Sequence, residues 1–279
     1  MTYNKLWRLL AQEYDRGEAQ AIARMVYEVR YGLTLSDIYS GKDTQLSADC
    51  QAELEEIAQR LASHEPVQYV LGTADFCGRP FHVEPGILIP RPETEHLCRL
   101  ILQSVLPPSP SVLDIGTGSG CIAVTLALDI PNSHVTAWDI SPTALRVAKD
   151  NAQRLGADVT FQEVDVLSSP SFWRGMGGGL SLIVSNPPYI CQSEAAQMES
   201  NVLDYEPRLA LFVPDDDPLR FYRPIVSYAH AALHAGGQLW LETNPLYLEQ
   251  ITALLLATGF HVTAHDDQFG KTRFIQAIR

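Results

Sequence analysis

The sequence predicts an α/β protein in which a small helical unit precedes a doubly wound sheet. Two patterns lead to this prediction. Before residue 73, apolar residues recur at the spacing of amphipathic helices. Beyond Ser111, short apolar runs alternate with helical segments, which is typical of a sheet covered by helices on both faces. The predicted strands cover residues 112–115, 135–139, 159–163, 180–185, 238–242, 261–264 and 274–278.

Residues 1–72 predict a domain of three helices. We expect Gly17 and Gly32 to mark the ends of the first two, because glycine is common just past a helix. Ser47 is expected to cap the third. The apolar faces consist of Leu6, Leu9 and Leu10, of Ile22, Met25, Val26 and Val29, and of Leu54, Ile57, Ala58 and Leu61.

Residues 73–90 predict a hairpin linker, with short strands at 74–77 and 81–83 around a turn. A helix is expected to begin at Pro92 or Thr94 and to be ended by the prolines of 107–110. Residues 91–279 then form the second domain. One of its helices has clear signals at both ends: Ser141 as N-cap, Pro142 in the first turn and Gly156 just past the end.

The composition is that of an ordinary soluble protein. Of the 279 residues, 46% are hydrophobic and 19% are charged, and no apolar stretch of about 18 residues could cross a bilayer. The N-terminal segment has no long apolar core, so a signal peptide is not expected and the predicted location is the cytoplasm. The five cysteines are scattered and never spaced as CxxC, which predicts reduced, mostly buried thiols and no metal site.

The net charge of −13 bears on the substrate. Binding DNA or RNA through phosphates requires clustered Lys and Arg, so an acidic chain favours a protein or a small molecule instead. We therefore expect no direct DNA binding.

A glycine loop follows the strand 112–115. It reads Gly116-Thr117-Gly118-Ser119-Gly120 and leads into an apolar helix, so the backbone there can approach a ligand closely. Asp139 ends the next strand, 23 positions after Gly116, near the interval at which an acidic residue reaches ribose hydroxyls in nucleotide-binding βαβ units. Together they predict a pocket for ribose and adenine.

The loop has two other interpretations. The glycines could form only a tight turn, with Asp139 capping the next helix. A nicotinamide cofactor would require the pattern G-x-G-x-x-G, whose third glycine would fall at Cys121. The pattern G-x-G-x-G instead resembles the S-adenosylmethionine loop of class I methyltransferases, which have a Rossmann-like sheet.

A second loop, Asn186-Pro187-Pro188-Tyr189, follows the apolar strand 180–185. Pro187 and Pro188 lack N–H groups and restrict the backbone, so the loop can hold the Asn186 side chain and the Pro187 carbonyl rigidly as acceptors. Such acceptors suit a planar NH2 group, whose nitrogen is a weak nucleophile that must be oriented during methyl transfer. Tyr189 could pack on the flat group. Adenine N6, cytosine N4 and glutamine N5 all present such an NH2 group. Pro187-Pro188 alone would indicate only a turn that leaves the sheet.

Over nearly its whole length, the chain resembles the PrmC/HemK family of peptide chain release factor glutamine methyltransferases. The most discriminating motif is Arg91-Pro92-Glu93-Thr94-Glu95. The chain departs from the family pattern at Thr243-Asn244 and at residues 215–217. The other motifs that carry the resemblance are the helical N-terminal unit, the hairpin, residues 114–120, residues 186–190, Glu206-Pro207 and Ala210-Leu211.

The resemblance implies a substrate, a cofactor and roles for single residues. The substrate would be the glutamine of the Gly-Gly-Gln loop of class 1 release factors, methylated on N5. The donor would be S-adenosyl-L-methionine, giving S-adenosyl-L-homocysteine, and the helical domain would dock the release factor to a monomeric enzyme. Arg91 and Glu93 would shape the cleft or act as a hinge. The cofactor residues would be Gly116, Thr117, Gly118, Ser119, Gly120, Asp139, Asp165, Val166 and Asn186; the substrate residues would be Asn186, Pro187, Pro188 and Tyr189; and the catalytic residues would be Asn186, Pro187 and Tyr189.

Two other functions use the same motifs. A nucleic-acid amino methyltransferase, for example one acting on N6 of adenine, could employ the Asn186 loop, but base flipping and duplex binding call for basic grooves. A cofactor-binding module without catalysis could retain the fold, although the presence of both Asp139 and Asn186 argues against it.

Overall fold

The computed structural model describes residues 1–168 and 179–279, and the chain divides into two compact units. Unit 1 comprises residues 1–73 and 199–205, and unit 2 comprises residues 74–198 and 206–279. Within the described residues, no helix has both the length and the apolar character that crossing a bilayer requires.

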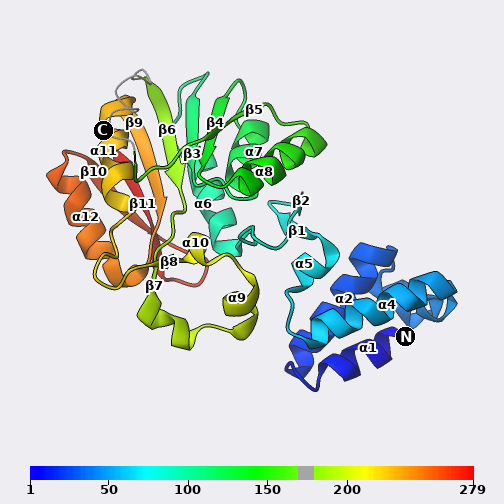
Figure 1. Ribbon diagram of the computed structural model, residues 1–279. Helices are drawn as coiled ribbons and strands as arrows, with labels where there is room; N and C mark the ends of the chain where they lie inside the picture. Colours follow the sequence, from blue (N-terminus) through cyan, green and yellow to red (C-terminus); the bar gives the residue numbers. More distant parts are fainter. Residues whose placement is uncertain (169–178) are drawn as a thin grey trace. The chain divides into compact units, whose positions relative to one another are not determined.

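Unit 1 is a helical bundle with its own apolar core (Figure 1). Its three longer helices confirm the three predicted ones, and the Ser47 side chain accepts from the Cys50 N–H as expected of an N-cap. Gly32 ends α2 in the left-handed conformation, as predicted. The prediction for Gly17 is wrong: the first helix ends at Leu10, and Gly17 lies in the first turn of α2, which Asp15 caps. The elements are α1 (Tyr3–Leu10), α2 (Arg16–Tyr31), α3 (Leu35–Tyr39), η1 (Lys42–Gln45), α4 (Ala48–Ala62), α5 (Val67–Leu71) and α9 (Ser200–Tyr205).

The predicted hairpin is confirmed. Its strands are β1 (Thr73–Phe76) and β2 (Arg79–His82), and they pair as a separate two-stranded sheet. The turn lies at Cys77 and Gly78, both with positive φ, one position earlier than the sequence suggested. Pro80 therefore belongs to β2, where a two-stranded sheet leaves room for a residue without an N–H.

A seven-stranded sheet forms the centre of unit 2, in the order β10-β11-β9-β6-β3-β4-β5. All seven predicted strands are present. Only β11 runs antiparallel to its two neighbours. The strands are β3 (Ser111–Ile115), β4 (His134–Asp139), β5 (Val159–Glu163), β6 (Leu180–Ser185), β9 (Leu233–Glu242), β10 (His261–Asp266) and β11 (Thr272–Ile278).

Strand β9 begins five residues earlier than predicted. The glycines at 236 and 237 indicated a turn before the strand, but the strand continues through them. Gly236 has φ +82°, and a Cβ on Gly237 would lie 3.0 Å from the Leu180 carbonyl oxygen, so only glycine allows β6 to approach there. The pairing shifts register at the same place, between Leu180 and Leu182.

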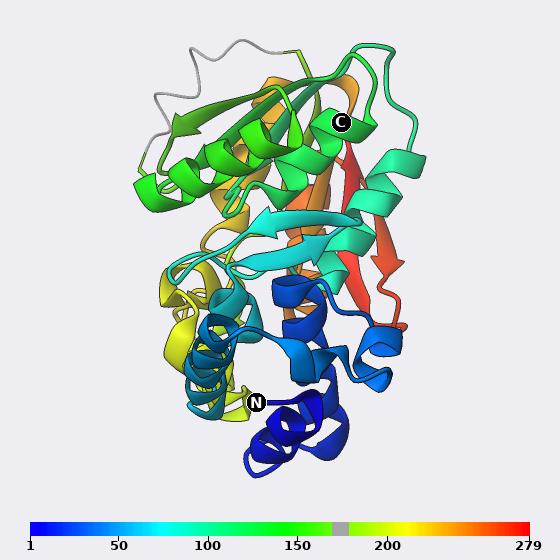
Figure 2. The same ribbon diagram turned by 90° about the vertical axis from the view of Figure 1, so that its right-hand side faces the viewer.

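Helices cover both faces of the sheet (Figures 1 and 2). The helix predicted at Pro92 or Thr94 begins at Pro92. It ends at Gln103, earlier than the prolines of 107–110 predicted, and the backbone of Ser104 is extended. The signals at Ser141, Pro142 and Gly156 are confirmed. The helices and short elements are α6 (Pro92–Gln103), α7 (Cys121–Asp129), α8 (Pro142–Leu155), β7 (Ile190–Cys191), η3 (Gln192–Gln197), α10 (Arg208–Leu211), β8 (Phe212–Val213), α11 (Tyr222–Ala232), η4 (Pro245–Tyr247) and α12 (Leu248–Ala257).

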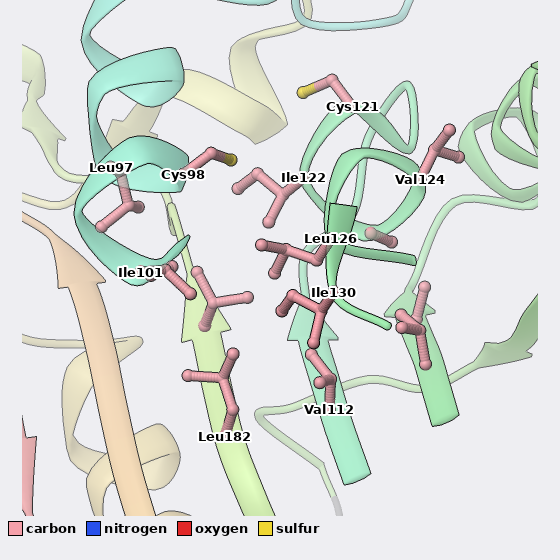
Figure 3. Close-up of a cluster of buried hydrophobic side chains, with 14 of the residues drawn as sticks. Leu97, Cys98, Ile101, Val112, Cys121, Ile122, Val124, Leu126, Ile130 and Leu182 are labelled. Atoms are coloured by element: carbon pink, nitrogen blue, oxygen red, sulfur yellow. The ribbon is translucent and has the colours of Figure 1, made fainter. Parts of the chain in front are cut away.

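Two apolar cores hold these layers together. One lies between the sheet and α6, α7 and α8, and the other lies between the sheet and α11 and α12. Figure 3 shows the first, where Leu97, Cys98 and Ile101 of α6 face Ile122 and Leu126 of α7, with Val112 and Leu182 on the sheet. This packing fixes the strands whose carboxyl ends carry the two loops.

Candidate active site

Three strand ends meet at one edge of the sheet. Ile115 of β3 pairs with Ser185 of β6 on one side and with Trp138 of β4 on the other. The Ser185 hydroxyl also donates to the Ile115 carbonyl at 2.7 Å. Gly116 and Asn186, which follow β3 and β6, and Asp139, the last residue of β4, are therefore neighbours at the carboxyl edge, where open α/β sheets bind ligands.

A cavity of about 420 Å³ lies at this edge, wholly within unit 2. Two of the predicted residues, Gly120 and Tyr189, lie outside the lining formed by the described residues. Arg91 and Thr94 line the cavity, but Glu93 does not. The predicted residues on its wall are Gly116, Thr117, Gly118, Ser119, Asp139, Asp165, Val166, Asn186, Pro187 and Pro188.

The glycine loop depends on left-handed backbone geometry. Gly116, Gly118 and Gly120 all have positive φ. A Cβ on Gly116 or Gly118 would meet nothing within 4 Å, whereas one on Gly120 would lie 2.9 Å from the Ala148 Cβ on α8. The first two glycines therefore leave open space beside the backbone, and the third lets the loop pack on α8.

Polar side chains also hold the glycine loop in place. The Thr117 hydroxyl donates to the buried Asp114 carboxyl at 2.7 Å. Burial raises the pKa of Asp114 to about 7. Asn151 on α8 donates to the Ser119 carbonyl at 2.9 Å and accepts from the His82 N–H at 2.7 Å, so the loop and strand β2 share one amide.

Asp139 links two backbone segments. Its Oδ2 accepts from the Gly118 N–H and its Oδ1 accepts from the Ser141 N–H, both at 2.9 Å. Burial raises the pKa of this carboxyl, and the same two N–H groups oppose the rise. Asp139 therefore helps start α8, as the simple turn interpretation held, and it also lines the cavity.

The part of the cavity beyond Asp139 has apolar walls. Ile140 and Leu167 line it and are 46% and 37% exposed, which is high for large aliphatic residues. Asp165 accepts from the Leu167 N–H at 2.8 Å and so shapes the turn that presents Val166. These side chains could cover the flat faces of an adenine ring, and the nearby Asp139 could accept from ribose hydroxyls. The sequence motifs did not point to Ile140 or Leu167.

The Asn186 loop is held by two side chains that the sequence analysis did not assign to the site. The Asn186 Nδ2 donates to the Thr94 hydroxyl at 3.1 Å, and this hydroxyl donates to Glu242 Oε2 at 2.8 Å. The Tyr189 hydroxyl donates to the other oxygen of Glu242 at 3.1 Å. The Tyr189 ring thus points toward Glu242. Thr94 could have been suspected from its place in the Arg91 to Glu95 motif.

Glu242 and Glu206 are buried carboxyls that contact Thr94 and Arg91 of the cavity wall. Burial raises the pKa of Glu242 to about 7, against the opposing effect of its bonds to Thr94 and Tyr189 and of the Arg273 charge. Glu206 forms an ion pair with Arg91 and accepts from the Ile89 N–H at 3.1 Å. This pairing ties the segment that supplies Pro207, Leu209 and Ala210 to the segment of Ile89 and Arg91, which also lines the cavity.

Comparison with known proteins agrees with this architecture. The family model described as Methyltransferase small domain matches residues 94–204, and the one described as PrmC N-terminal domain matches residues 5–72. The crystal structure of a methyltransferase from Pyrococcus furiosus is similar over 83% of this chain and 98% of its own, with a TM-score of 0.52 and 17% identity, which bears on the fold alone. The sheet, the loops and these matches define a class I methyltransferase.

Relatives with higher identity narrow the class. A release factor glutamine methyltransferase from Bacteroides thetaiotaomicron is 46% identical over 95% of this chain and 95% of its own length. Those from Flavobacterium psychrophilum and Streptococcus pneumoniae are 38% and 37% identical, covering 96% and 93% of this chain and 94% and 92% of their own. The chain belongs to the family of release factor glutamine methyltransferases.

Proposed function

We propose that this chain transfers a methyl group from S-adenosyl-L-methionine to N5 of the glutamine in the Gly-Gly-Gln loop of class 1 peptide chain release factors. One observation of the site carries the proposal. The Asn186 amide lines the cavity beside the glycine loop, with its nitrogen already bonded to Thr94. Its oxygen is thereby left to accept from a substrate NH2. The names of the relatives suggest that this NH2 belongs to a glutamine amide.

The residues of the cavity suit the proposed cofactor. We assign the backbone of Gly116 and Gly118 to its methionine part, Asp139 to the ribose hydroxyls, and the walls at Ile140, Asp165, Val166 and Leu167 to the adenine. When bound, S-adenosyl-L-methionine supplies a methyl group activated by the positive charge on sulfur. The acidic Asp139 and the mainly apolar slot match the polar and flat parts of such a molecule.

In the proposed mechanism, the protein orients a weak nucleophile. Asn186 Oδ1 and the Pro187 carbonyl accept hydrogen bonds from the glutamine NH2 and so direct the nitrogen lone pair toward the methyl group. These acceptors also stabilise the positive charge that develops on nitrogen. As the new N–C bond forms, the S–C bond of the donor would break and leave S-adenosyl-L-homocysteine. No ionised base is required before transfer, because the nitrogen becomes acidic as it is methylated and then gives its proton to water.

We further propose that three segments of the chain have separate functions. Residues 1–72 dock the release factor, residues 73–90 link the domains, and residues 91–279 carry out the transfer. The separate apolar core of unit 1 supports a module with a task of its own. We expect a monomer, and because release factors act on the ribosome, the proposed location is the cytoplasm.

The test is methyl transfer from labelled cofactor to a purified class 1 release factor. The matched substrate is the same factor with its loop glutamine replaced by glutamate, which has no NH2 to methylate. Label on the first factor and none on the second is the expected result. Label on DNA or RNA offered in parallel, with none on the factor, would overturn the proposal.

A further inference from the structure

A buried chain of hydrogen bonds leads from the Asn186 amide into the interior of unit 2. It runs from Asn186 to Thr94 on α6 and ends at Glu242, the last residue of β9. Thr94 and Glu242 are 3% and 1% exposed, so the bond between them is shielded from water, whereas the bond from Asn186 is partly buried at the cavity wall. The three residues come from segments far apart in the sequence.

The direction of each bond in this chain is set by its inner end. Above its pKa of about 7, the Glu242 carboxyl is ionised and only accepts, so the single proton of the Thr94 hydroxyl is used on Glu242 Oε2. The hydroxyl can then only accept from Asn186, which places the amide nitrogen against Thr94. Amide orientation is decided by such partners, since the nitrogen and oxygen ends are nearly the same size.

The consequence falls on the other end of the amide. Within the described residues, Asn186 Oδ1 has no protein donor, and the side chain lines the cavity. If the Thr94 proton were free to point outward, the amide could turn and present its NH2 to the substrate NH2. Two donors would then face each other, and the nitrogen would lose its acceptor.

We infer that Glu242, acting through Thr94, is a positioning residue that fixes the Asn186 amide with its oxygen toward the substrate nitrogen. The inference rests on the proposed function for its substrate, but the amide orientation itself does not depend on which planar NH2 is bound. The Tyr189 hydroxyl occupies the second oxygen of Glu242, so the carboxyl is also held from the other side. Thr94 and Glu242 touch neither reacting atom in this account.

The test compares Thr94→Val with Thr94→Ser at a pH of about 8.5, where Glu242 is ionised. Valine keeps the shape of threonine but removes the hydroxyl, and serine restores it. With the release factor as substrate, we expect kcat to fall about tenfold or more in Thr94→Val, with KM for the factor and cofactor affinity within about twofold, and to recover in Thr94→Ser. Thr125→Val is the control. It removes a buried hydroxyl of α7 that has no hydrogen-bond partner among the described residues, and kcat should not change.

A second measurement does not depend on methyl transfer. In 15N-labelled protein, the Asn186 side-chain NH2 should show a hydrogen-bonded proton shift in the wild type and in Thr94→Ser, and lose it in Thr94→Val. An unchanged shift in Thr94→Val, or equal kcat for the valine and wild-type enzymes, overturns the inference. A wild-type enzyme that leaves the factor unmethylated overturns the proposed function alone, because the NMR comparison still decides the role of Thr94.

Discussion

The two halves of the cavity are held in place by different means. The proposed cofactor half is built from the glycine loop and Asp139, which lie within 24 residues of chain and are joined through backbone N–H groups. The proposed reacting half is built on the loop in which Asn186 lines the cavity and Tyr189 lies outside its lining, and side chains 92 and 53 positions away hold these two residues. Each half nevertheless rests on a buried carboxyl that accepts from a threonine hydroxyl, Asp114 in one and Glu242 in the other.

This difference suggests where each half is vulnerable. A backbone loop is disturbed mainly by changes in chain geometry, and the expected result is weaker cofactor binding or lower stability. A side-chain network is disturbed by removal of one polar group, and the expected result is slower transfer. The following predictions test this separation, beginning with the largest effect.

Asn186→Ala should lower turnover by about 10² to 10³, because the lost acceptor acts on the charge that develops in the transition state. The dissociation constant for the cofactor should stay within about threefold. Steady-state kinetics and calorimetry measure the two quantities. Equal losses in turnover and in cofactor affinity would show that the halves are not separable.

Gly120→Ala should destabilise the protein by about 2 to 4 kcal/mol. The backbone at this position has φ +81°, which alanine rarely adopts, and the added Cβ would lie 2.9 Å from the Ala148 Cβ. Gly156→Ala is the matched control. Gly156 also has positive φ, at +77°, but its Cβ would meet nothing within 4 Å, so only the backbone cost of about 1 kcal/mol remains. Chemical denaturation should separate the two variants, and equal losses would argue against tight packing of the loop on α8.

The buried carboxyls predict a loss of stability as the pH rises. Their folded pKa values of about 7 exceed the unfolded values of about 4, so the unfolded chain releases these protons first. The contribution of each carboxyl to stability is full below the unfolded pKa and is lost as the pH rises through the folded pKa. Around Glu242, the charge of Arg273 opposes this shift and that of Glu93 adds to it.

Asp114→Asn isolates one of these groups. Between pH 5 and pH 8, the free energy of unfolding of the wild type should fall by about 2 kcal/mol more than that of this variant, because asparagine does not titrate. Urea denaturation at both pH values measures the change, and Glu242→Gln should behave alike. Parallel stability curves for variant and wild type would contradict the assignment.

Asp139→Asn should weaken cofactor binding about tenfold, because a neutral amide accepts less strongly and cannot replace both oxygens toward Gly118, Ser141 and the ribose. At saturating cofactor, kcat should remain within about twofold. This is the reverse of the result expected for Asn186→Ala. A large fall in kcat at saturation would move Asp139 into the reacting half.

The predictable parts of the molecule were those with local signals. The strands, the hairpin and the helix that begins at Ser141 follow from apolar periodicity, glycines and caps within a few residues. The glycine loop and Asp139 form one βαβ unit, so their meeting could be inferred. The positive φ at Gly236 and the close approach of Gly237 to β6 were not visible, which is why β9 was predicted too short.

The supports of the reacting half could not be predicted in the same way. The contact between Thr94 and Glu242 depends on how α6 packs beside β9, and no periodicity or motif records such a pairing. Tyr189 looked like a ring for the substrate, yet its hydroxyl is bonded to Glu242 and the residue lies outside the cavity lining. Long-range tertiary packing therefore determines what the motif residues face.

The proposed chemistry is tested most directly by mapping the methyl group on the product. A class 1 release factor incubated with the enzyme and S-adenosyl-L-methionine should carry one added methyl group, located by tandem mass spectrometry on the side-chain nitrogen of the Gly-Gly-Gln glutamine. A factor without that methyl group, or with the methyl group on a different residue, would contradict the account.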